Sequence, residues 1–275
     1  MSKLPTLGAA LRPEELPPHI DWLIDGVRDL EIHGLHYPAG LIAGDWKPRA
    51  AEVRKLLKNH KGRQGMHGPT TTPLASNDPG VRALAQERLG QGLDVCEELG
   101  LTQMVIHSPY IHWDQENLYR QPGRRAGKLA DFIATIEPLM QRAEALGVEM
   151  VIENVEDRDP VIRRDIVRHF KSAALKVSVD TGHANYANRM GAAPSVDMFV
   201  REAGEDLAHL HLQDTDGHAD RHWTIGEGNV PWRPVFEELG RLSSNPRLIL
   251  ESKQPTLGAS LSPSAEHLVK MGLAV

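Results

Sequence analysis

The stretch MVIENVEDRDPVIRRDIVRHFKSAALKVSVDTGH, residues 150–183, contains two short apolar runs that each end in residues able to bind a metal ion. The first run ends at Glu153, and the second ends at Asp180 with His183 close behind. Short apolar runs bounded by polar residues are typical of buried strands, and the segment between them is long enough for a helix. Strand, helix and strand in this order predict a parallel α/β unit.

The same pattern recurs along most of the chain. Four more apolar runs end in a residue type that binds metals: MHGP at His67, MVIHSP at His107, LHLQD at His211 and LILESK at Glu251. Eight segments in all are strand candidates: 6–11, 29–35, 62–68, 103–109, 148–155, 175–181, 207–214 and 247–253. Eight units of strand and helix predict an α/β fold, a closed (β/α)8 TIM barrel rather than an open sheet, with residues 1–275 as a single domain.

Two segments between the strand candidates have clear helical signals. Residues 79–99 carry an apolar stripe at helical spacing and are followed by Gly100, and residues 125–146 are followed by Gly147. A glycine directly after an amphipathic segment is a common helix stop. Both segments therefore favour helical connections between parallel strands.

Composition argues against several classes of protein. The formal net charge of −6 and the lack of a consecutive basic block give no general support for binding a nucleic acid, although residues 120–125 form a local basic cluster. Cys96 is the only cysteine, which excludes an intramolecular disulfide. No apolar run reaches the roughly 20 residues that cross a bilayer, so we expect no membrane insertion and a cytoplasmic location.

Polar side chains at the strand ends are the candidate metal ligands, because parallel strands in a barrel all end at one rim. The nine candidates are His67, His107, Glu153, Asp180, His183, His211, Asp220, His222 and Glu251. Imidazole and carboxylate ligands together suit zinc or manganese better than metals that need thiolates. A lone histidine at a strand end is more often a hydrogen-bonded structural residue, so the prediction of one to three divalent ions rests on the recurrence.

Two long loops are candidate lids or substrate walls. Residues 109–125 contain Trp113 and Tyr119, and residues 215–232 contain Trp223. In a barrel, both loops would overhang the rim that carries the ligands.

Other histidines have more than one interpretation. His33 and His36 follow the second strand candidate and could face a substrate or have a structural role. His209 alternates with His211, so both should point to the same side of their strand. Since His211 lies nearer the rim, it is the better candidate ligand.

The segments IENVED, SVDTGH, HLHLQD, DRHWTIGEGNVPW and LESK resemble the strand ends of the xylose-isomerase-like TIM barrel superfamily. This superfamily contains sugar phosphate isomerases and epimerases and the AP endonuclease family 2, or endonuclease IV. In the isomerase and epimerase branch, the resemblance implies a divalent metal held by Glu153, Asp180, His211 and Glu251. The resemblance to endonuclease IV implies three zinc ions, with further ligands at His67, His107, His183, Asp220 and His222.

Two positions depart from the free-ketose 3-epimerases of this superfamily. Asp159 stands where those enzymes usually have a glutamate, and Gly217 stands where they have an arginine. These departures disfavour a free ketose as the substrate. The lesion-probing residues of endonuclease IV cannot be identified in the segment HGPTTTPL either, which disfavours DNA as a partner without excluding it.

The leading hypothesis is a divalent-metal-dependent isomerase or epimerase of a small sugar, sugar phosphate or related polyol. The metal would stabilise the enediolate that forms when the C–H group next to a carbonyl loses its proton. Resemblance to the epimerases suggests that Glu153 and Glu251 exchange this proton, and His183, Trp113 and Trp223 are candidate substrate-binding residues. The alternative is an endonuclease IV-like multi-zinc phosphodiesterase. The exact substrate, the metal and the oligomeric state, including a homo-oligomer, stay open.

Overall fold

Eight parallel strands close into a barrel, with each strand paired to its neighbours in chain order and β8 paired to β1. The computed structural model describes residues 4–35, 46–253, 259 and 261–275. The strands are β1 (Gly8–Leu11), β2 (Leu30–Ile32), β3 (Gln64–His67), β4 (Gln103–His107), β5 (Glu149–Glu153), β6 (Leu175–Asp180), β7 (Leu207–Leu212) and β8 (Arg247–Leu250). All eight strand candidates are confirmed, and so is the closed (β/α)8 barrel.

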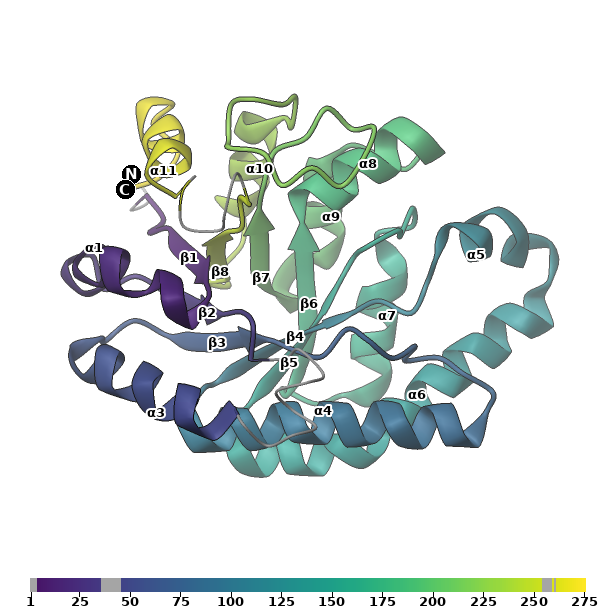
Figure 1. Ribbon diagram of the computed structural model, residues 1–275. Helices are drawn as coiled ribbons and strands as arrows, with labels where there is room; N and C mark the ends of the chain where they lie inside the picture. The colour runs from purple at the N-terminus through teal and green to yellow at the C-terminus, as the bar shows by residue number, and fades with distance from the viewer. Residues whose placement is uncertain (1–3, 36–45, 254–258, 260) are drawn as a thin grey trace.

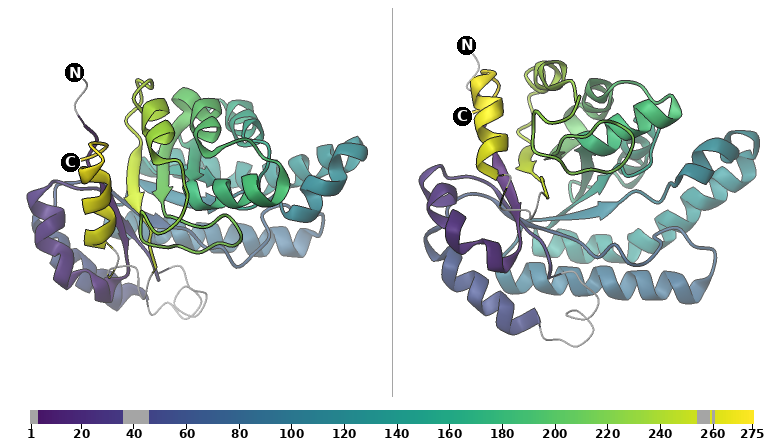
Figure 2. Two further views of the ribbon diagram at one scale, coloured as in Figure 1. Left: turned by 90° about the horizontal axis from the view of Figure 1, so that it is seen from above. Right: turned by 45° about the horizontal axis from the view of Figure 1, so that its top comes forward.

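Helices surround the strands, as Figure 1 and Figure 2 show. They are α1 (Ile20–Asp25), α3 (Trp46–Leu56), α4 (Pro79–Leu99), α5 (His112–Asn117), α6 (Pro122–Leu146), α7 (Val161–Phe170), α8 (Thr181–Gly191), α9 (Val196–Ala203), α10 (Trp232–Leu239) and α11 (Leu261–Lys270). Single turns of 3-10 helix are η1 (Pro13–Glu15), η2 (Pro17–His19), η3 (Leu57–Asn59), η4 (Leu118–Arg120) and η5 (Gly204–Asp206). None of the helices in the described part of the chain is both long and apolar enough to span a membrane.

The two expected helices are present, and their ends follow from local chemistry. The Asp78 side chain accepts hydrogen bonds from the backbone N–H groups of Gly80 and Val81 at the start of α4. Gly100 and Gly147 end α4 and α6 with φ of 69° and 65°, a left-handed conformation that glycine adopts without strain. Helix α6 begins at Pro122, three residues before the expected start at residue 125.

The prediction of a loop at residues 109–125 is wrong, because most of this segment is helical. It contains α5, η4 and the first turn of α6, and Figure 1 places α5 near the outer end of α6. Asp114 stabilises this arrangement, since its carboxylate accepts from the Ile111 N–H at 3.0 Å and pairs with Lys128 of α6 at 2.5 Å. Short helices held by such distant ion pairs leave little periodic signal in the sequence.

The second expected loop, between β7 and α10, is irregular and lies beyond the ends of β6 and β7, next to α8 (Figure 1). Asp214 organises it: one carboxylate oxygen accepts from the N–H groups of Thr215 and Val230, and the other accepts from Gly226 N–H and from the Trp232 indole. This segment carries Asp220 and His222, so a single buried carboxylate fixes the backbone that presents them.

Strand register brings ligand candidates to the same level of the barrel. His107 of β4 is the partner of Glu153 of β5, and Asp180 of β6 is the partner of His211 of β7. All four lie at the carboxyl ends of their strands, where active sites of this fold are built. The barrel therefore sets these side chains beside one another before any loop contributes.

Candidate metal centre

The nine candidate ligands converge at the carboxyl end of the barrel and form three groups. In each group, one nitrogen or oxygen of every member lies within 4.8 Å of the others. The first group is His67, His107 and Glu153; the central group is Glu153, Asp180, His211 and Glu251; the third group is His183, Asp220 and His222. A cavity of about 270 Å³ opens over them. Glu153 belongs to both the first and the central group.

The first group has an open carboxylate oxygen at its centre. Glu153 Oε2 is buried and has no hydrogen-bond partner among the described residues. It lies 3.4 Å from His107 Nε2 and 3.7 Å from His67 Nε2. Ligand atoms about 2.1 Å from a tetrahedral ion lie roughly 3.4 Å apart, so these three atoms fit a shared cation.

The central group surrounds one imidazole nitrogen with carboxylates. His211 Nδ1 lies 2.8 Å from Glu153 Oε1, 3.4 Å from Glu251 Oε2 and 4.0 Å from Asp180 Oδ2. On its other side, His211 Nε2 donates to Glu31 Oε1 at 2.9 Å. A carboxylate behind a ligating histidine fixes the ring and increases its basicity, which is a common arrangement in metal sites. Glu31 is this carboxylate for His211.

The third group combines one residue of α8 with the D-x-H pair of the irregular segment. Asp220 Oδ1 lies 3.4 Å from His183 Nε2 and 3.0 Å from His222 Nε2. The other ring nitrogen of each histidine donates to a backbone carbonyl, that of Asn154 at 2.8 Å and that of Glu251 at 2.9 Å. A carbonyl can only accept, so Nδ1 carries a proton and Nε2 is the ring atom left to bind a metal ion. His67 follows the same rule, because its Nδ1 donates to Gly68 O at 3.0 Å.

Electrostatics at the site also favour a cation. Burial alone would raise the pKa of Glu153, but the charge and hydrogen bond of His211 outweigh burial and hold this pKa well below its usual range. Burial opposes protonation of His211, yet the charges of Glu251, Glu31 and Glu153 raise its pKa well above the usual value. Buried carboxylates thus draw positive charge to themselves, and bound cations would replace the protons that supply it.

Two other members of the groups have pKa values shifted toward their neutral forms, Asp180 upward and His107 downward. Burial raises the pKa of Asp180, and the neighbouring charges of Glu153 and Glu251 add to this effect. Burial also lowers the pKa of His107 to about 4, so its imidazole is neutral and able to coordinate at neutral pH. The donor set, the open oxygen of Glu153 and the fixed histidine tautomers all fit divalent ions of the zinc or manganese type.

Sequence reasoning missed two supporting residues. Glu31 is a buried acid in the middle of β2 that contacts His33 at 2.6 Å and His209 at 3.0 Å as well as His211. Gln213 donates from its amide to both Asp180 and Asp220 and accepts from the His222 N–H at 3.0 Å, which ties the central group to the third. A charged residue inside an apolar strand was the only available signal for Glu31.

His33 and His209 both contact Glu31, and each could form a metal group with His211. His33 lines the cavity, and His209 is fully buried below His211, where Ser178 lies 2.8 Å from its Nδ1. His36 lies outside the described residues. His209 and His211 do point to the same side of β7, since both contact Glu31.

The aromatic candidates are Trp113, Tyr119 and Trp223, the last of which directly follows the ligand candidate His222. Trp113 and Tyr119, on α5 and η4, are 45% and 64% exposed, and Arg124 and Arg120 cover their rings. Trp223 pairs its backbone with Asp214. None of the three is among the described residues that line the cavity, so their substrate contacts stay a prediction.

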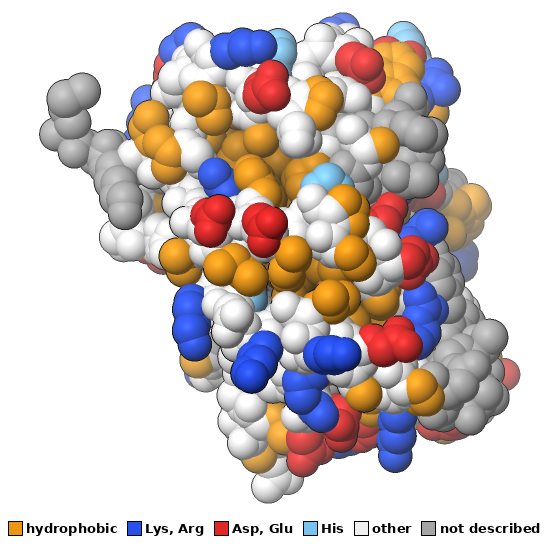
Figure 3. All heavy atoms as spheres, turned by 60° about the vertical axis from the view of Figure 1, so that its left-hand side comes forward, with side chains coloured by type: hydrophobic (Ala, Val, Ile, Leu, Met, Phe, Trp, Pro, Cys, Tyr) orange, Lys and Arg blue, Asp and Glu red, His pale blue; other side chains and the backbone are white. Residues whose placement is uncertain are grey.

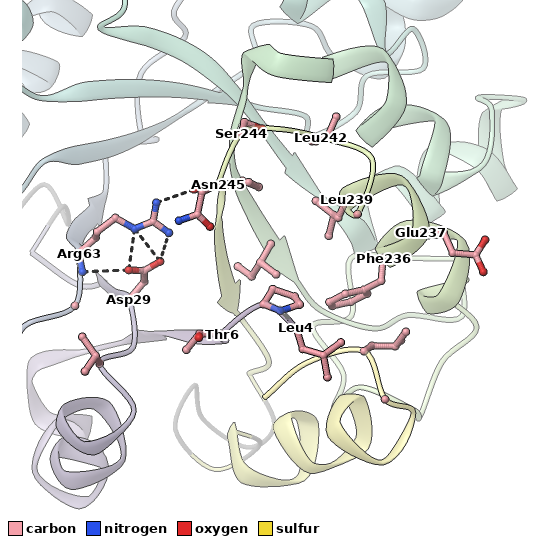
Figure 4. A pocket seen from close by; sticks show the side chains of 18 of the residues that line it. Leu4, Thr6, Asp29, Arg63, Phe236, Glu237, Leu239, Leu242, Ser244 and Asn245 are labelled. Atoms are coloured by element: carbon pink, nitrogen blue, oxygen red, sulfur yellow. Dashed lines mark hydrogen bonds and ion pairs between the residues drawn. The ribbon is translucent and has the colours of Figure 1, made fainter. Parts of the chain in front are cut away.

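A larger cavity, of about 630 Å³, opens at the amino end of the barrel (Figure 4). Apolar side chains such as Leu4, Phe236 and Leu239 line it beside an ion pair in which Arg63 Nε lies 3.0 Å from Asp29 Oδ1. Seen from the side of Figure 3, hydrophobic side chains fill hollows between charged ones. No member of the three ligand groups lines this larger cavity, so it is separate from the candidate metal centre.

Several known proteins are similar to this chain in sequence. The chain is 27% identical to the uncharacterized protein MJ1311 of Methanocaldococcus jannaschii, over 68% of this chain and 64% of that protein. It is 27% identical to a ketose 3-epimerase of Arthrobacter globiformis, over 66% of this chain and 60% of that protein. It is also 24% identical to a probable endonuclease 4 of Ureaplasma parvum, over 80% of this chain and 76% of that protein.

A solved structure and a family model complete the comparison. The structure of the TTHB071 protein from Thermus thermophilus, soaked with ZnCl2, superposes with a TM-score of 0.67 at 26% identity and covers 94% of this chain and 98% of that one. Residues 25–271 match the model of the family described as xylose isomerase-like TIM barrel. This chain therefore belongs to the xylose isomerase-like TIM barrel family.

Proposed function

We propose that the protein is a divalent-metal-dependent isomerase or epimerase of a small sugar, sugar phosphate or related polyol. The observation that carries this proposal is the central group, in which buried Glu153, Asp180, His211 and Glu251 point at one position on the rim. The similarity to a ketose 3-epimerase supports the same reaction class. The cavity of about 270 Å³ suits a small molecule.

Two carboxylates of the central group have the state that a proton transfer needs. The pKa of Glu251 lies below its usual value, because the charges of His211 and Lys253 outweigh burial, so it is ionised at neutral pH, as Glu153 is. They approach from β5 and β8, on different sides of the barrel, so one carboxylate can accept the proton that the substrate carbon loses. The other can return a proton to that carbon after taking one up from solvent. A bound divalent ion would polarise the substrate carbonyl and stabilise the negative charge that develops.

Proton exchange in heavy water tests this proposal. Protein loaded with zinc or manganese is incubated in deuterium oxide with ketoses, ketose phosphates and inositol-type ketones, and exchange is followed by NMR. We expect exchange at a carbon next to the carbonyl that depends on the metal and is lost in Glu153→Gln and Glu251→Gln. Turnover without any exchange would point to a hydride shift and contradict the proposed mechanism.

The division into three groups favours a second candidate function, a multi-zinc phosphodiesterase. Endonuclease-type chemistry would use two or three ions to activate water and bind the phosphate oxygens, and the similarity to a probable endonuclease 4 supports it. Two or three tightly bound zinc ions together with cleavage of an abasic-site duplex would favour this candidate. A loaded protein that leaves the duplex intact but exchanges substrate protons would exclude it.

A further inference from the structure

Two basic side chains face the cavity from neighbouring strands. Arg12 directly follows β1, and Lys253 lies just beyond the end of β8. Strands β1 and β8 are paired, with Ala9 opposite Leu250, so the two side chains enter the cavity from the same part of the rim. Neither belongs to a ligand group.

Arg12 has a guanidinium group that no described residue pairs with. Its Nε is buried, and no hydrogen bond or ion pair engages the group among the described residues. The backbone N–H of Arg12 donates to Glu15 at 2.9 Å, which holds the turn that positions the side chain. A buried donor without an acceptor costs free energy, and an anion bound in the cavity would remove that cost.

Lys253 lies at the border between the cavity and the ligand groups. Its ammonium is 2.8 Å from Glu251 Oε1 and 3.3 Å from His222 Nε2, and it stays 39% exposed. An ammonium has three donors, and these contacts leave capacity for a further acceptor on the cavity side.

The charge of the ligand groups with metal ions bound also favours an anion in the cavity. The ligand groups contain four carboxylates, Glu153, Asp180, Asp220 and Glu251, so one divalent ion in each of the three groups would more than neutralise them. The charges of Arg12 and Lys253 would then add to an excess of positive charge around the cavity. A substrate with an anionic group would supply a counter-charge.

We propose that Arg12 and Lys253 bind an anionic group of the substrate, a phosphate or a carboxylate, and so select a sugar phosphate or sugar acid over a neutral sugar. This inference rests on the proposed function and narrows its substrate class. Arginine favours such groups because its planar donors match two oxygens at once. The reacting carbons would lie over the central group, on the side of the cavity away from β1.

Anion binding can be measured before any substrate is known. Inorganic phosphate, acetate and neutral D-fructose are titrated by calorimetry into zinc-loaded protein from which free zinc has been removed. We expect phosphate or acetate to bind, and we expect Arg12→Gln to weaken this binding about tenfold or more with an unchanged zinc content. Arg168→Gln, on the exposed face of α7, is the matched control and should bind as the wild type does.

The outcomes separate the two proposals. Preference for phosphate over acetate identifies a sugar phosphate, and the reverse preference identifies a sugar acid. Equal affinity of the Arg12 and Arg168 variants, or no binding of either anion, overturns the inference. Arg12-dependent binding without proton exchange in any sugar phosphate or acid would keep the anion site and reject the reaction class. Proton exchange in a neutral ketose that Arg12→Gln leaves unchanged would keep the reaction class and reject the anion site.

Discussion

At the scale of single residues, Glu31 shows how a carboxylate outside the ligand groups controls the site. It is almost fully buried and accepts from His211 Nε2, so it holds the ring that points its other nitrogen at the central group. Because Glu31 and His211 are 180 residues apart in sequence, no local pattern could reveal this contact.

We expect Glu31→Gln to weaken metal binding about tenfold or more, since the neutral amide is a poorer acceptor for the ring N–H of His211. Competition with a fluorescent chelator measures the affinity. Glu98→Gln, on the surface at the end of α4, is the control and should leave affinity unchanged. An unchanged affinity in Glu31→Gln would show that Glu31 has no part in holding the ligand.

The three groups also predict different metal counts for two variants. Asp220 belongs to the third group alone, whereas Glu153 contributes its two oxygens to the first and central groups. We therefore expect Asp220→Asn to lose the ion of one group and Glu153→Gln to lose the ions of two. Mass spectrometry of zinc in the purified variants counts them, with exposed Asp165→Asn as the control. The same count in both variants would contradict the division into groups.

At the scale of elements, helix α7 holds together the two strands that carry Glu153 and Asp180. The Arg163 guanidinium is fully buried and donates to the carbonyls of Ile152 in β5 and Ser178 in β6. Ile152 directly precedes Glu153, and Ser178 lies two residues before Asp180. The helix thus fixes the spacing of two strand ends through one side chain.

We expect Arg163→Leu to destabilise the fold by about 3 kcal/mol, because it removes charged hydrogen bonds and leaves the buried Asp157 without its nearby positive charge. Urea unfolding measures this loss. Arg168→Leu, on the exposed face of the same helix, should cost less than about 1 kcal/mol. Equal effects would show that the burial of Arg163 is unimportant.

The strand ends could be predicted from sequence because each ligand sits where its own apolar run stops, as at Glu153, Asp180 and His211. A closed barrel then brings distant runs together without further information. The helical nature of residues 112–120 could not be predicted, because it depends on the pairing of Asp114 with Lys128 in another element. The role of Arg163 was equally hidden, since Arg164 and Arg168 in the same helix look alike in sequence.

At the scale of the whole molecule, the site couples folding to pH. Without metal, the raised pKa values of His211 and His183 mean that the folded state holds protons that the unfolded state has lost at mildly alkaline pH. Their contribution to stability is complete below the ordinary histidine pKa of about 6.5 and is lost as pH rises through the folded values. Bound metal replaces these protons.

We expect the melting temperature of chelator-treated protein to fall as pH rises from about 7 to about 9, because these imidazolium groups lose their protons. Metal-loaded protein should melt at a higher temperature and should not show this fall, because metal binding improves as the imidazoles deprotonate. Calorimetric scans across this range provide the measurement. Parallel pH dependence of both forms would contradict the assignment of these histidines as ligands.

The position of Glu153 between two groups has a consequence for how ions enter. Its Oε1 faces the central group and its Oε2 faces the first, so rotation of one carboxylate redirects both oxygens together. An ion bound in one group fixes the orientation of Glu153 and so places its other oxygen for an ion in the second group. Because such coupling is reciprocal, the second ion also increases the affinity for the first. The first and central groups would then fill cooperatively, so that both hold an ion or neither does.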